Sequence, residues 1–341
     1  MLVVREGECI VGLAPWYVDP SPLWGRVVKQ LGSGEVCSDY QTLLAAPGCE
    51  REVAAAVAQY LRVELRNQWD RLDLDGVVVG DAALTALVDE LHLHGAPIER
   101  RRGPSCWRVA LPATFDDYLA LCSKSHRKQL RRLERNVLDT DRAVWHTVRS
   151  IDDFAIAWPI FVDLHQRRRR SLGEAGCFQS PCFQAFHEEM ARGLLARGLL
   201  RLHWLELDGT PIAAEYHLQS GGVVYGYQSG VDPQRLDEEP GRLAGIAVIR
   251  QAISEGLATY DLLRGDEPYK AHWRALPTPT EQITVVNGRR RSRARHAVHQ
   301  LLRRVKHKLF GPPPPAHVTE AATSAIHDAE VSTPATFETT R

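Results

Sequence analysis

The 341-residue sequence has little of what marks secreted, membrane-spanning or metal-binding chains. It contains no run of 18 apolar residues, so no transmembrane helix is predicted. Its first residues, MLVVREGECIVG, lack the basic leader and the apolar core of a signal peptide. The seven cysteines form no CxxC pair, and their odd number argues against a disulfide framework. We therefore expect a cytoplasmic protein in a reducing compartment, without a bound metal.

Acidic residues are missing from one long segment. The 42 basic and 42 acidic residues balance over the chain, yet no acid lies between Gln282 and Thr319. Within this segment, apolar residues recur at helical spacing: Val298, Leu301, Leu302, Val305 and Leu309. This pattern predicts an amphipathic helix that packs on the body of the protein, or one that lies on an anionic membrane or on nucleic acid. The tail after it is rich in Pro, Ala and Thr and is expected to be disordered.

An internal repeat is the most informative pattern. LVVREGECIVGLAPWYV from Leu2 and LHWLELDGTPIAAEYHL from Leu202 both read as hairpins that turn at an acid-glycine pair. After the first hairpin we expect an irregular stretch, then a helix at 50–65 and a strand at 72–79. In the second copy, a strand at 143–148 and helices at 152–170 and 181–197 should precede the hairpin. After the hairpin we expect a third strand of the meander at 222–229, a helix at 241–255, and strands at 257–263 and 282–286. Because Met1 already lies in the first hairpin, we expect the first copy to be N-terminally incomplete, either naturally or because the start of the sequence is placed too late.

These elements predict an α/β chain with mixed (α+β) sheets and five segments. The expected segments are a partial copy at 1–113, basic connecting helices between the copies at 114–141, a complete copy at 142–287, a basic amphipathic helix at 288–310 and the disordered tail at 311–341.

Six stretches in a fixed order carry a family resemblance. They are SHRKQLRRLERNV from Ser125, LHQRRRRSLGEAGCF from Leu164, LDGTPIAAEY from Leu207, YGYQSGVDP from Tyr225, EPGRLAG from Glu239 and YDLLRGDEPYK from Tyr260. The element order resembles the GNAT N-acyltransferase fold, and two copies in tandem resemble the FemABX arrangement. The stretch from Ala120 to Trp273 is similar to the acetyltransferase domain of CelD-like proteins, which are associated with cellulose and exopolysaccharide synthesis.

The resemblance implies an N-acyltransferase with acetyl-CoA or another acyl-CoA as co-substrate. Its acceptor would be a small molecule or glycan precursor, such as an amino sugar, reached by direct transfer from the thioester. Residues 289–310 would then contact the inner face of the membrane or the exopolysaccharide machinery. Two alternatives stay open: FemABX-like transfer from aminoacyl-tRNA, and a non-catalytic scaffold in exopolysaccharide synthesis. No DNA partner is expected.

RLAGIA, which begins at Arg242, is the predicted cofactor motif. It fits the GNAT pattern Arg/Gln-x-x-Gly-x-Gly/Ala, in which backbone N–H groups at a helix start cradle the pyrophosphate of acyl-CoA. The acids just before it can also be ordinary helix capping, and they would repel a pyrophosphate unless they point away. The resemblance assigns cofactor binding to Tyr227, Gly241, Arg242, Leu243, Ala244 and Gly245.

Acyl transfer to an amine needs a base, donors for the oxyanion and often an acid for the leaving thiolate. The candidate base is Glu215 or Asp261, although Asp261 can equally pair with an arginine as a structural bridge. The candidate acid is Tyr225, Tyr227 or Tyr269. We predict as catalytic residues Glu215, Asp261, Tyr269 and Lys270, and as substrate-binding residues His165, Arg168, Tyr225, Arg264, Asp266 and Trp273. For the cations near His165 a helix-dipole role stays open, and for the segment from Arg264 to Trp273 a solvated loop.

Overall fold

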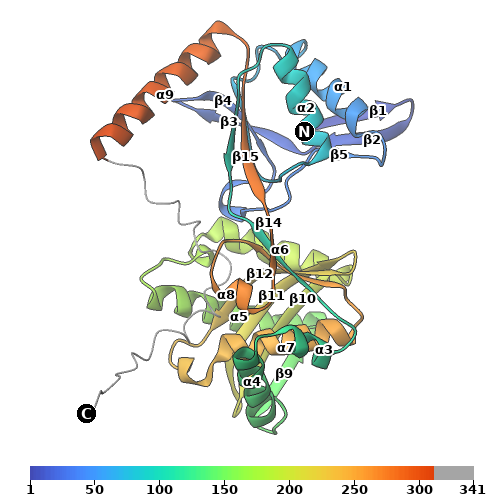
Figure 1. Ribbon diagram of the computed structural model, residues 1–341, viewed down its shortest axis with the longest axis vertical. Coiled ribbons are helices and arrows are strands. Elements are labelled where there is room, and N and C mark those ends of the chain that lie inside the picture. Colours follow the sequence, from blue (N-terminus) through green and yellow to red (C-terminus); the bar gives the residue numbers. More distant parts are fainter. Residues whose placement is uncertain (311–341) are drawn as a thin grey trace, which may run out of the picture. The chain divides into compact units, whose positions relative to one another are not determined.

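The computed structural model describes residues 1–310, with side chains to residue 302, and forms two units (Figure 1). The first unit combines residues 1–106 with residues from 278 onward, and the second comprises residues 107–277. The predicted tail at 311–341 lies outside the described residues. Among the described helices, none is long and apolar enough to cross a bilayer.

The second unit is built on a seven-stranded mixed sheet with the order β14-β8-β13-β12-β11-β10-β9. Its strands are β8 (Cys106–Ala110), β9 (Ala143–Thr147), β10 (Leu200–Leu207), β11 (Thr210–Ser220), β12 (Val223–Val231), β13 (Thr259–Arg264) and β14 (Leu276–Thr278). Its helices are α3 (Phe115–Leu121), α4 (Lys124–Leu133), α5 (Ile151–Ser171), α6 (Pro181–Ala196), α7 (Pro240–Ser254) and α8 (Tyr269–His272). Strands β9 to β12 are antiparallel neighbours, whereas β12 and β13 run parallel. The predicted order of elements from β9 to β13 is confirmed.

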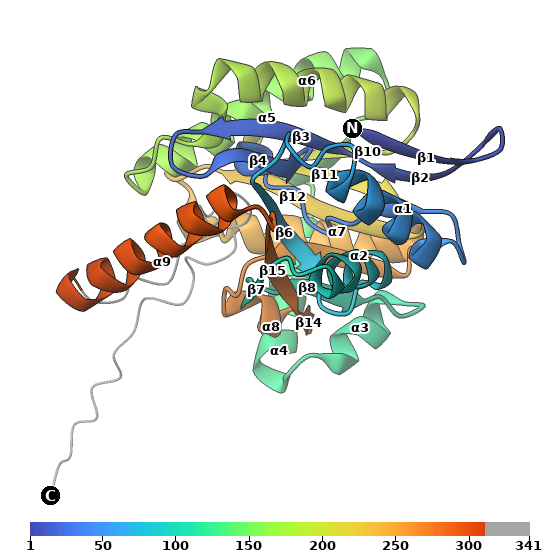
Figure 2. The ribbon, with the colours of Figure 1, turned by 90° about the horizontal axis from the view of Figure 1, so that it is seen from above.

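Helices lie on both sides of this sheet (Figure 2), and each face has its own hydrophobic core. Because side chains alternate along a strand, Leu205 and Ala213 enter a core shared with α3, α4 and α7. Trp204 and Ala214 enter the opposite core, shared with α5 and α6. We call these two sides of the sheet the α7 face and the α5 face.

Helix α5 lies directly against β12. A Cβ atom built on Gly230 would lie 2.3 Å from the backbone nitrogen of His165, so only glycine permits this approach. The helix begins with a capping box in which Ser150 and Asp153 bond each other's backbone N–H groups. The capping box at Ser150 and the close approach at Gly230 therefore fix how α5 packs on strands β10 to β12.

The first unit has a five-stranded sheet with the order β3-β4-β6-β15-β7 and a smaller sheet with the order β1-β2-β5. Its strands are β1 (Leu2–Glu6), β2 (Cys9–Ala14), β3 (Trp16–Ser21), β4 (Gly25–Gln30), β5 (Leu44–Ala45), β6 (Arg71–Val78), β7 (Ile98–Arg102) and β15 (Thr280–Val286). Its helices are α1 (Glu50–Arg62), α2 (Ala82–Leu93) and α9 (Arg290–Phe310). Strands β4 and β6 are parallel and joined through α1, as β12 and β13 are joined through α7. This connection is the structural repeat.

The stretch after the first hairpin is not irregular, as we expected, but forms the hairpin of β3 and β4. β3 contains Pro20, and proline removes a donor from the hydrogen-bond ladder of a sheet. β3 is tolerated because it lies at the edge of its sheet. The predicted first hairpin does form, but β1 and β2 belong to the separate small sheet.

The strand that we expected to close the second copy belongs to the first unit. β15 lies between β6 and β7, where Glu281 pairs with both Val77 and Arg102. In the second unit, β8 takes the equivalent place between β13 and β14. The contacts therefore divide the chain near residues 106 and 278 rather than at 113 and 287. Strand pairing is non-local, so a sequence pattern does not name the partner.

The basic helices at 114–141 do not bridge the copies as we expected. In α3 and α4, the side chains of Tyr118, Leu119, Leu130 and Leu133 are buried in the core of the α7 face. Their apolar sides therefore make them part of the second unit.

Candidate active site

Strands β12 and β13 pair at their beginnings and then part. The register starts at Val223 with Thr259 and ends at Tyr225 with Asp261. In the described part of the chain no later pair joins these strands, although β12 continues to Val231. Backbone groups without a ladder partner need other partners, and an extended ligand can supply them. The space between β12 and β13 beyond Tyr225 and Asp261 is thus a candidate ligand-binding site.

A bulge in β12 lies at the same point. The register against β11 shifts so that Tyr227 is one extra residue on β12. Its hydroxyl lies 2.9 Å from Nε2 of His187 in α6. Tyr227, which we predicted to bind the cofactor, therefore points into the core of the α5 face.

Glu215 is buried on the α7 face beside the parting. Its Oε2 atom lies 3.0 Å from Nε2 of His217, two residues further along β11. Its cross-strand partner is Ser229, which shares this face. Nδ1 of His217 and Oγ of Ser229 are buried and have no hydrogen-bond partner among the described residues. Buried polar atoms are normally bonded, so these two indicate where a polar ligand would bind.

Tyr260 of β13 lies on the same face. Its ring centroid is 5.5 Å from that of His217, and its Oη would be 3.2 Å from a Cβ atom built on Gly226. Burial, reinforced by the nearby Glu215 carboxylate, raises the pKa of Tyr260 well above its usual value. The phenol therefore stays protonated at neutral pH, and its O–H group can donate a hydrogen bond. We did not predict this residue, because in the sequence it reads as an ordinary strand aromatic.

The carboxylate of Glu239 lies at the N-terminus of α7. Glu239 precedes the helix with a φ of 56°. Its side chain contacts the guanidinium groups of Arg132 and Arg242 and accepts a 2.9 Å hydrogen bond from Gln129. Arg242, which we predicted to bind pyrophosphate, is therefore paired with Glu239. An anionic ligand at this helix end must displace that carboxylate or bind beside it.

The first two turns of α7 are tightly packed. All the predicted cofactor residues on this helix are buried: Gly241, Arg242, Leu243, Ala244 and Gly245. A Cβ atom on Gly245 would lie 2.8 Å from the ring of Trp273. The glycine of the predicted motif therefore has a packing role, whether or not a phosphate approaches the helix.

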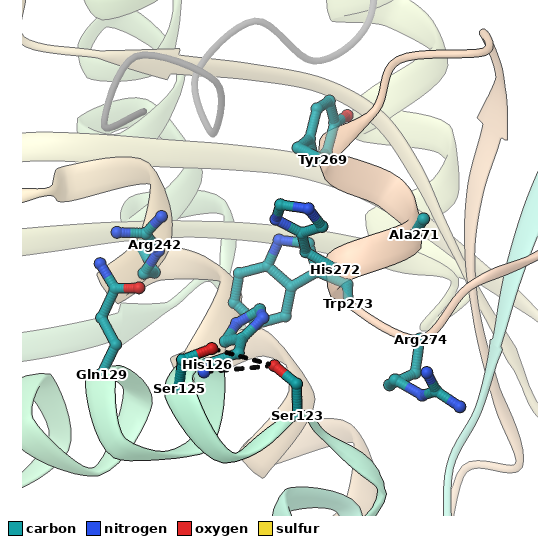
Figure 3. Close-up of a pocket in the computed structure, with 10 residues that line it drawn as sticks. All are labelled: Ser123, Ser125, His126, Gln129, Arg242, Tyr269, Ala271, His272, Trp273 and Arg274. Carbon is teal, nitrogen blue, oxygen red and sulfur yellow. Dashed lines mark hydrogen bonds between the residues drawn. The ribbon is translucent and has the colours of Figure 1, made fainter. Parts of the chain in front are cut away.

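A pocket of about 340 Å³ opens between α4, the start of α7 and α8 (Figure 3). It brings together three predicted site residues, Arg242, Tyr269 and Trp273. The other lining residues were not predicted: Ser123, Ser125, His126, Gln129, Ala271, His272 and Arg274. The start of α4, with its positive helix end, supplies four of them. Hydroxyl, imidazole and guanidinium groups make this pocket suited to an anionic group.

Lys270, a predicted catalytic residue, holds the loop between β13 and α8. Its fully buried Nζ donates to the carbonyl oxygens of Leu263, Arg264 and Gly265 at 3.2, 3.0 and 3.1 Å. It also lies 2.9 Å from Oε2 of Glu267. The three carbonyl oxygens already match the three donors of the ammonium group, so the geometry favours a structural role.

For Asp261 we predicted either a catalytic base or a structural bridge to an arginine, and its contacts favour the structural bridge. It is fully buried, its Oδ1 accepts the backbone N–H of Leu263 at 2.9 Å, and its Oδ2 lies 3.3 Å from Nε of Arg108. Leu263 has a φ of 54°, a conformation that non-glycine residues rarely adopt. Asp261 therefore helps to hold a strained strand end.

Three of the remaining predicted site residues are Tyr225, Arg264 and Asp266. Tyr225 pairs with Asp261 across the strands, so it lies on the α5 face like Leu218, its partner on β11. Arg264 is buried at the end of β13, and the exposed Asp266 accepts a 3.1 Å hydrogen bond from the indole of Trp107.

His165 and Arg168 lie on α5, in the body of the unit. His165 is buried with Nε2 3.1 Å from Oε1 of Gln228, and burial, with Arg169 nearby, lowers its pKa to about 4. Burial also lowers the pKa of Arg168. Neither the pocket nor the α7 face contains them, so the structure does not bring these two predicted substrate residues together with Glu215.

Residues 124–271 match the family model described as an acetyltransferase (GNAT) domain. This match and the mixed sheet with its parted central strands define a GNAT fold, and the domain implies an acyltransferase. A search of curated proteins found no match to the sequence.

Comparison with solved structures gives alignments over most of the chain. The structure of FemX has a TM-score of 0.60 and 11% identity, and the alignment covers 88% of this chain and 89% of FemX. A conserved protein of unknown function from Bacteroides thetaiotaomicron has a TM-score of 0.54 and 9% identity, over 80% of this chain and 84% of that one. A tandem GNAT protein from the clavulanic acid biosynthesis pathway has a TM-score of 0.43 and 14% identity, over 83% and 81%. At such identities, the likeness to FemX shows the fold alone.

Proposed function

We propose that the second unit transfers an acyl group from an acyl-CoA, with acetyl-CoA as the first candidate, to an amine. The observation that carries this proposal is the parting of β12 and β13 after Tyr225 and Asp261. The pantetheine arm of CoA is an extended chain of two amides, and the backbone groups of parted strands can bond such a chain as a further strand would. The narrower resemblance to CelD-like proteins supplies the acceptor class, an amino sugar or another cell-envelope precursor.

The α7 face supplies groups for direct transfer. The acceptor amine attacks the thioester carbonyl, and Glu215, paired with His217, takes the proton that the nitrogen loses. Backbone N–H groups of β12 at the bulge bond the oxyanion. The carbon–sulfur bond then breaks, and Tyr260 protonates the leaving thiolate. Return of a proton from Glu215 to Tyr260 restores both groups, so the products are an amide and free CoA.

The proposal is tested by calorimetric titration of acetyl-CoA into the wild-type chain and into Glu239→Gln. Removing the carboxylate frees Arg132, Arg242 and Gln129 for phosphate, so we expect about tenfold tighter binding in the variant. Glu238→Gln is the matched control, because Glu238 pairs with Arg142 and Arg235 and should leave affinity unchanged. If neither the wild type nor Glu239→Gln binds any acyl-CoA, the proposal is wrong.

Aminoacyl transfer from tRNA is the second candidate. It is favoured by the occupied N-terminus of α7, because Glu239 already satisfies the cations that a pyrophosphate would need. Specific binding of aminoacyl-tRNA, with affinity that falls steeply as salt rises, would favour this donor over acyl-CoA. A non-catalytic scaffold would bind neither donor.

A further inference from the structure

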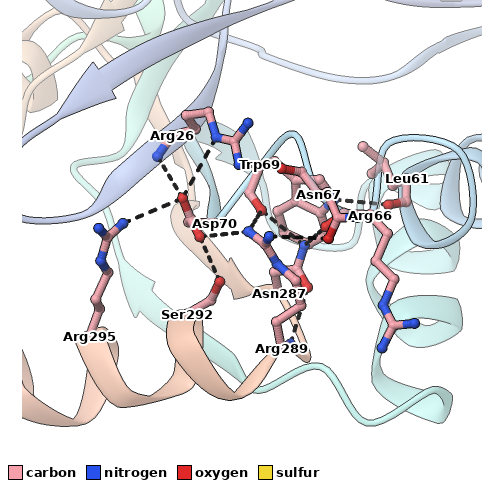
Figure 4. Close-up of polar contacts among 10 residues, drawn as sticks. All are labelled: Arg26, Leu61, Arg66, Asn67, Trp69, Asp70, Asn287, Arg289, Ser292 and Arg295. Carbon is pink, nitrogen blue, oxygen red and sulfur yellow. Dashed lines mark hydrogen bonds and ion pairs between the residues drawn. The ribbon is translucent and has the colours of Figure 1, made fainter.

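Helix α9 is held to the first unit through polar groups at its start (Figure 4). The buried carboxylate of Asp70 accepts hydrogen bonds from the backbone N–H of Arg26 at 2.9 Å and from Ser292 and Arg289 at 2.7 Å each. Arg295 lies 3.5 Å away. Although burial opposes it, these donors lower the pKa of Asp70. The carboxylate thus fixes which side of α9 faces the unit.

The same side continues along the helix. The ring centroid of His299 lies 3.7 Å from that of Trp24, and Gln300 donates a 2.9 Å hydrogen bond to Glu99. Ser292 and His299 are seven residues apart, which places them on one helical side. α9 therefore meets the body with hydroxyl, imidazole and amide groups, and not with its described apolar residues, which one of our predicted placements packs there.

The described apolar residues of α9 face solvent, whereas Val305 and Leu309 of the predicted apolar side lie beyond the described side chains. Val298, Leu301 and Leu302 are 57%, 62% and 55% exposed. Arg291, also exposed, stands seven residues before Val298 and so lies on the same side. A helix of a soluble domain normally buries its apolar stripe against the core, and α9 presents the stripe outward instead.

We propose that this outward face of α9 binds the surface of a bilayer that contains anionic lipid, with the helix lying in the interface. Leucine and valine side chains would enter the acyl-chain boundary, and the flanking arginines would meet lipid phosphates. The first turn of α9 contains Arg290, Arg291 and Arg293, and no acidic residue lies in the sequence of the helix. This surface is independent of the acyl-transfer site.

Charge and shape together favour a membrane over other partners. A second copy of α9 would bring one basic helix against another, which like-charge repulsion opposes. Nucleic acid would engage the arginines but leave the exposed leucines in water. Anionic lipid is the partner that satisfies both the cations and the apolar row.

The test is flotation of the full chain with vesicles of phosphatidylglycerol and phosphatidylcholine, compared with vesicles of phosphatidylcholine alone. We expect binding to the anionic vesicles only. The double variant Leu301→Gln with Leu302→Gln should weaken it by at least about tenfold, because it removes apolar area and keeps every charge. Leu93→Gln is the matched control, since Leu93 is an exposed leucine of α2 and should leave binding intact.

Circular dichroism and light scattering accompany the flotation, so that loss of helix or a change of mass is detected. Arg290→Gln with Arg291→Gln should also weaken binding and reduce its dependence on salt. The proposal is overturned if anionic vesicles do not bind the wild type, or if they bind the leucine variant equally well. The proposal is also overturned if the wild type does not bind vesicles and instead forms a dimer that the leucine substitutions dissociate. That result would indicate self-association.

Discussion

Gly245 lies against the indole ring of Trp273, so closely that a Cβ atom on Gly245 would come within 2.8 Å of the ring. Gly245 belongs to the first turns of α7, and Trp273 follows α8. The contact thus joins the helix after β12 to the segment after β13, the two strands that part. It also gives the glycine of the predicted cofactor motif a role in packing.

Gly245→Ala should destabilise the second unit by about 1–3 kcal/mol through overpacking against Trp273. Urea unfolding measures this change. Gly193→Ala is the matched control, because Gly193 is also helical and a Cβ atom there meets nothing within 4 Å. That substitution should be neutral or stabilise by up to about 1 kcal/mol. An equal effect of both substitutions would contradict the packing role.

Lys270→Met should lower the free energy of unfolding by about 3 kcal/mol, because it leaves three carbonyl oxygens and Glu267 without their buried cation. Lys124→Met, at an exposed position, should change stability by less than about 0.5 kcal/mol. Chemical unfolding of both variants checks the difference. A Lys270→Met protein with normal stability and no activity would restore the catalytic interpretation.

Glu215→Gln should lower kcat by about 100-fold or more and leave the fold intact, because the amide still bonds His217 but accepts no proton. Initial rates with acetyl-CoA and an amino-sugar acceptor measure the loss. Glu189→Gln, at an exposed position of α6, is the control and should retain full activity. Unchanged kcat in Glu215→Gln would remove this residue from the mechanism.

Mild acid should destabilise the second unit through two buried histidines. Burial lowers the pKa of both His165 and His187 to about 4, from an ordinary value of 6.5. The unfolded chain therefore binds protons first, and the stability that these residues contribute above pH 6.5 is lost as pH falls toward 4. The expected slope is about 1.4 kcal/mol per pH unit for each histidine.

Thermal unfolding between pH 7.5 and 4.5 measures this slope. His165→Gln should reduce it by about one proton, since glutamine does not titrate. His94→Gln, which changes an exposed histidine of the first unit, is the control. A slope that is the same in all three proteins would mean that His165 is not responsible.

The order of elements in the second unit could be predicted, because hairpin turns, helical periodicity and caps are local. Glu215 could be placed on a strand face with His217 by the same reasoning, since alternation along β11 is local. The pairing of β15 with β6 and β7 could not, because any strand edge offers the same backbone groups. The role of Lys270 was missed for a similar reason: its three carbonyl partners are set by the path of a loop.

The sequence by itself determined the repeated α/β units, the basic run without acids and the apolar residues of α9, because these follow from residue type and spacing. The tertiary structure decided which groups meet. It paired Arg242 with Glu239, brought His126 and Tyr269 to one pocket, and turned Leu301 toward solvent. These outcomes depend on close approach between segments distant in the chain, and periodicity within one segment does not contain that information.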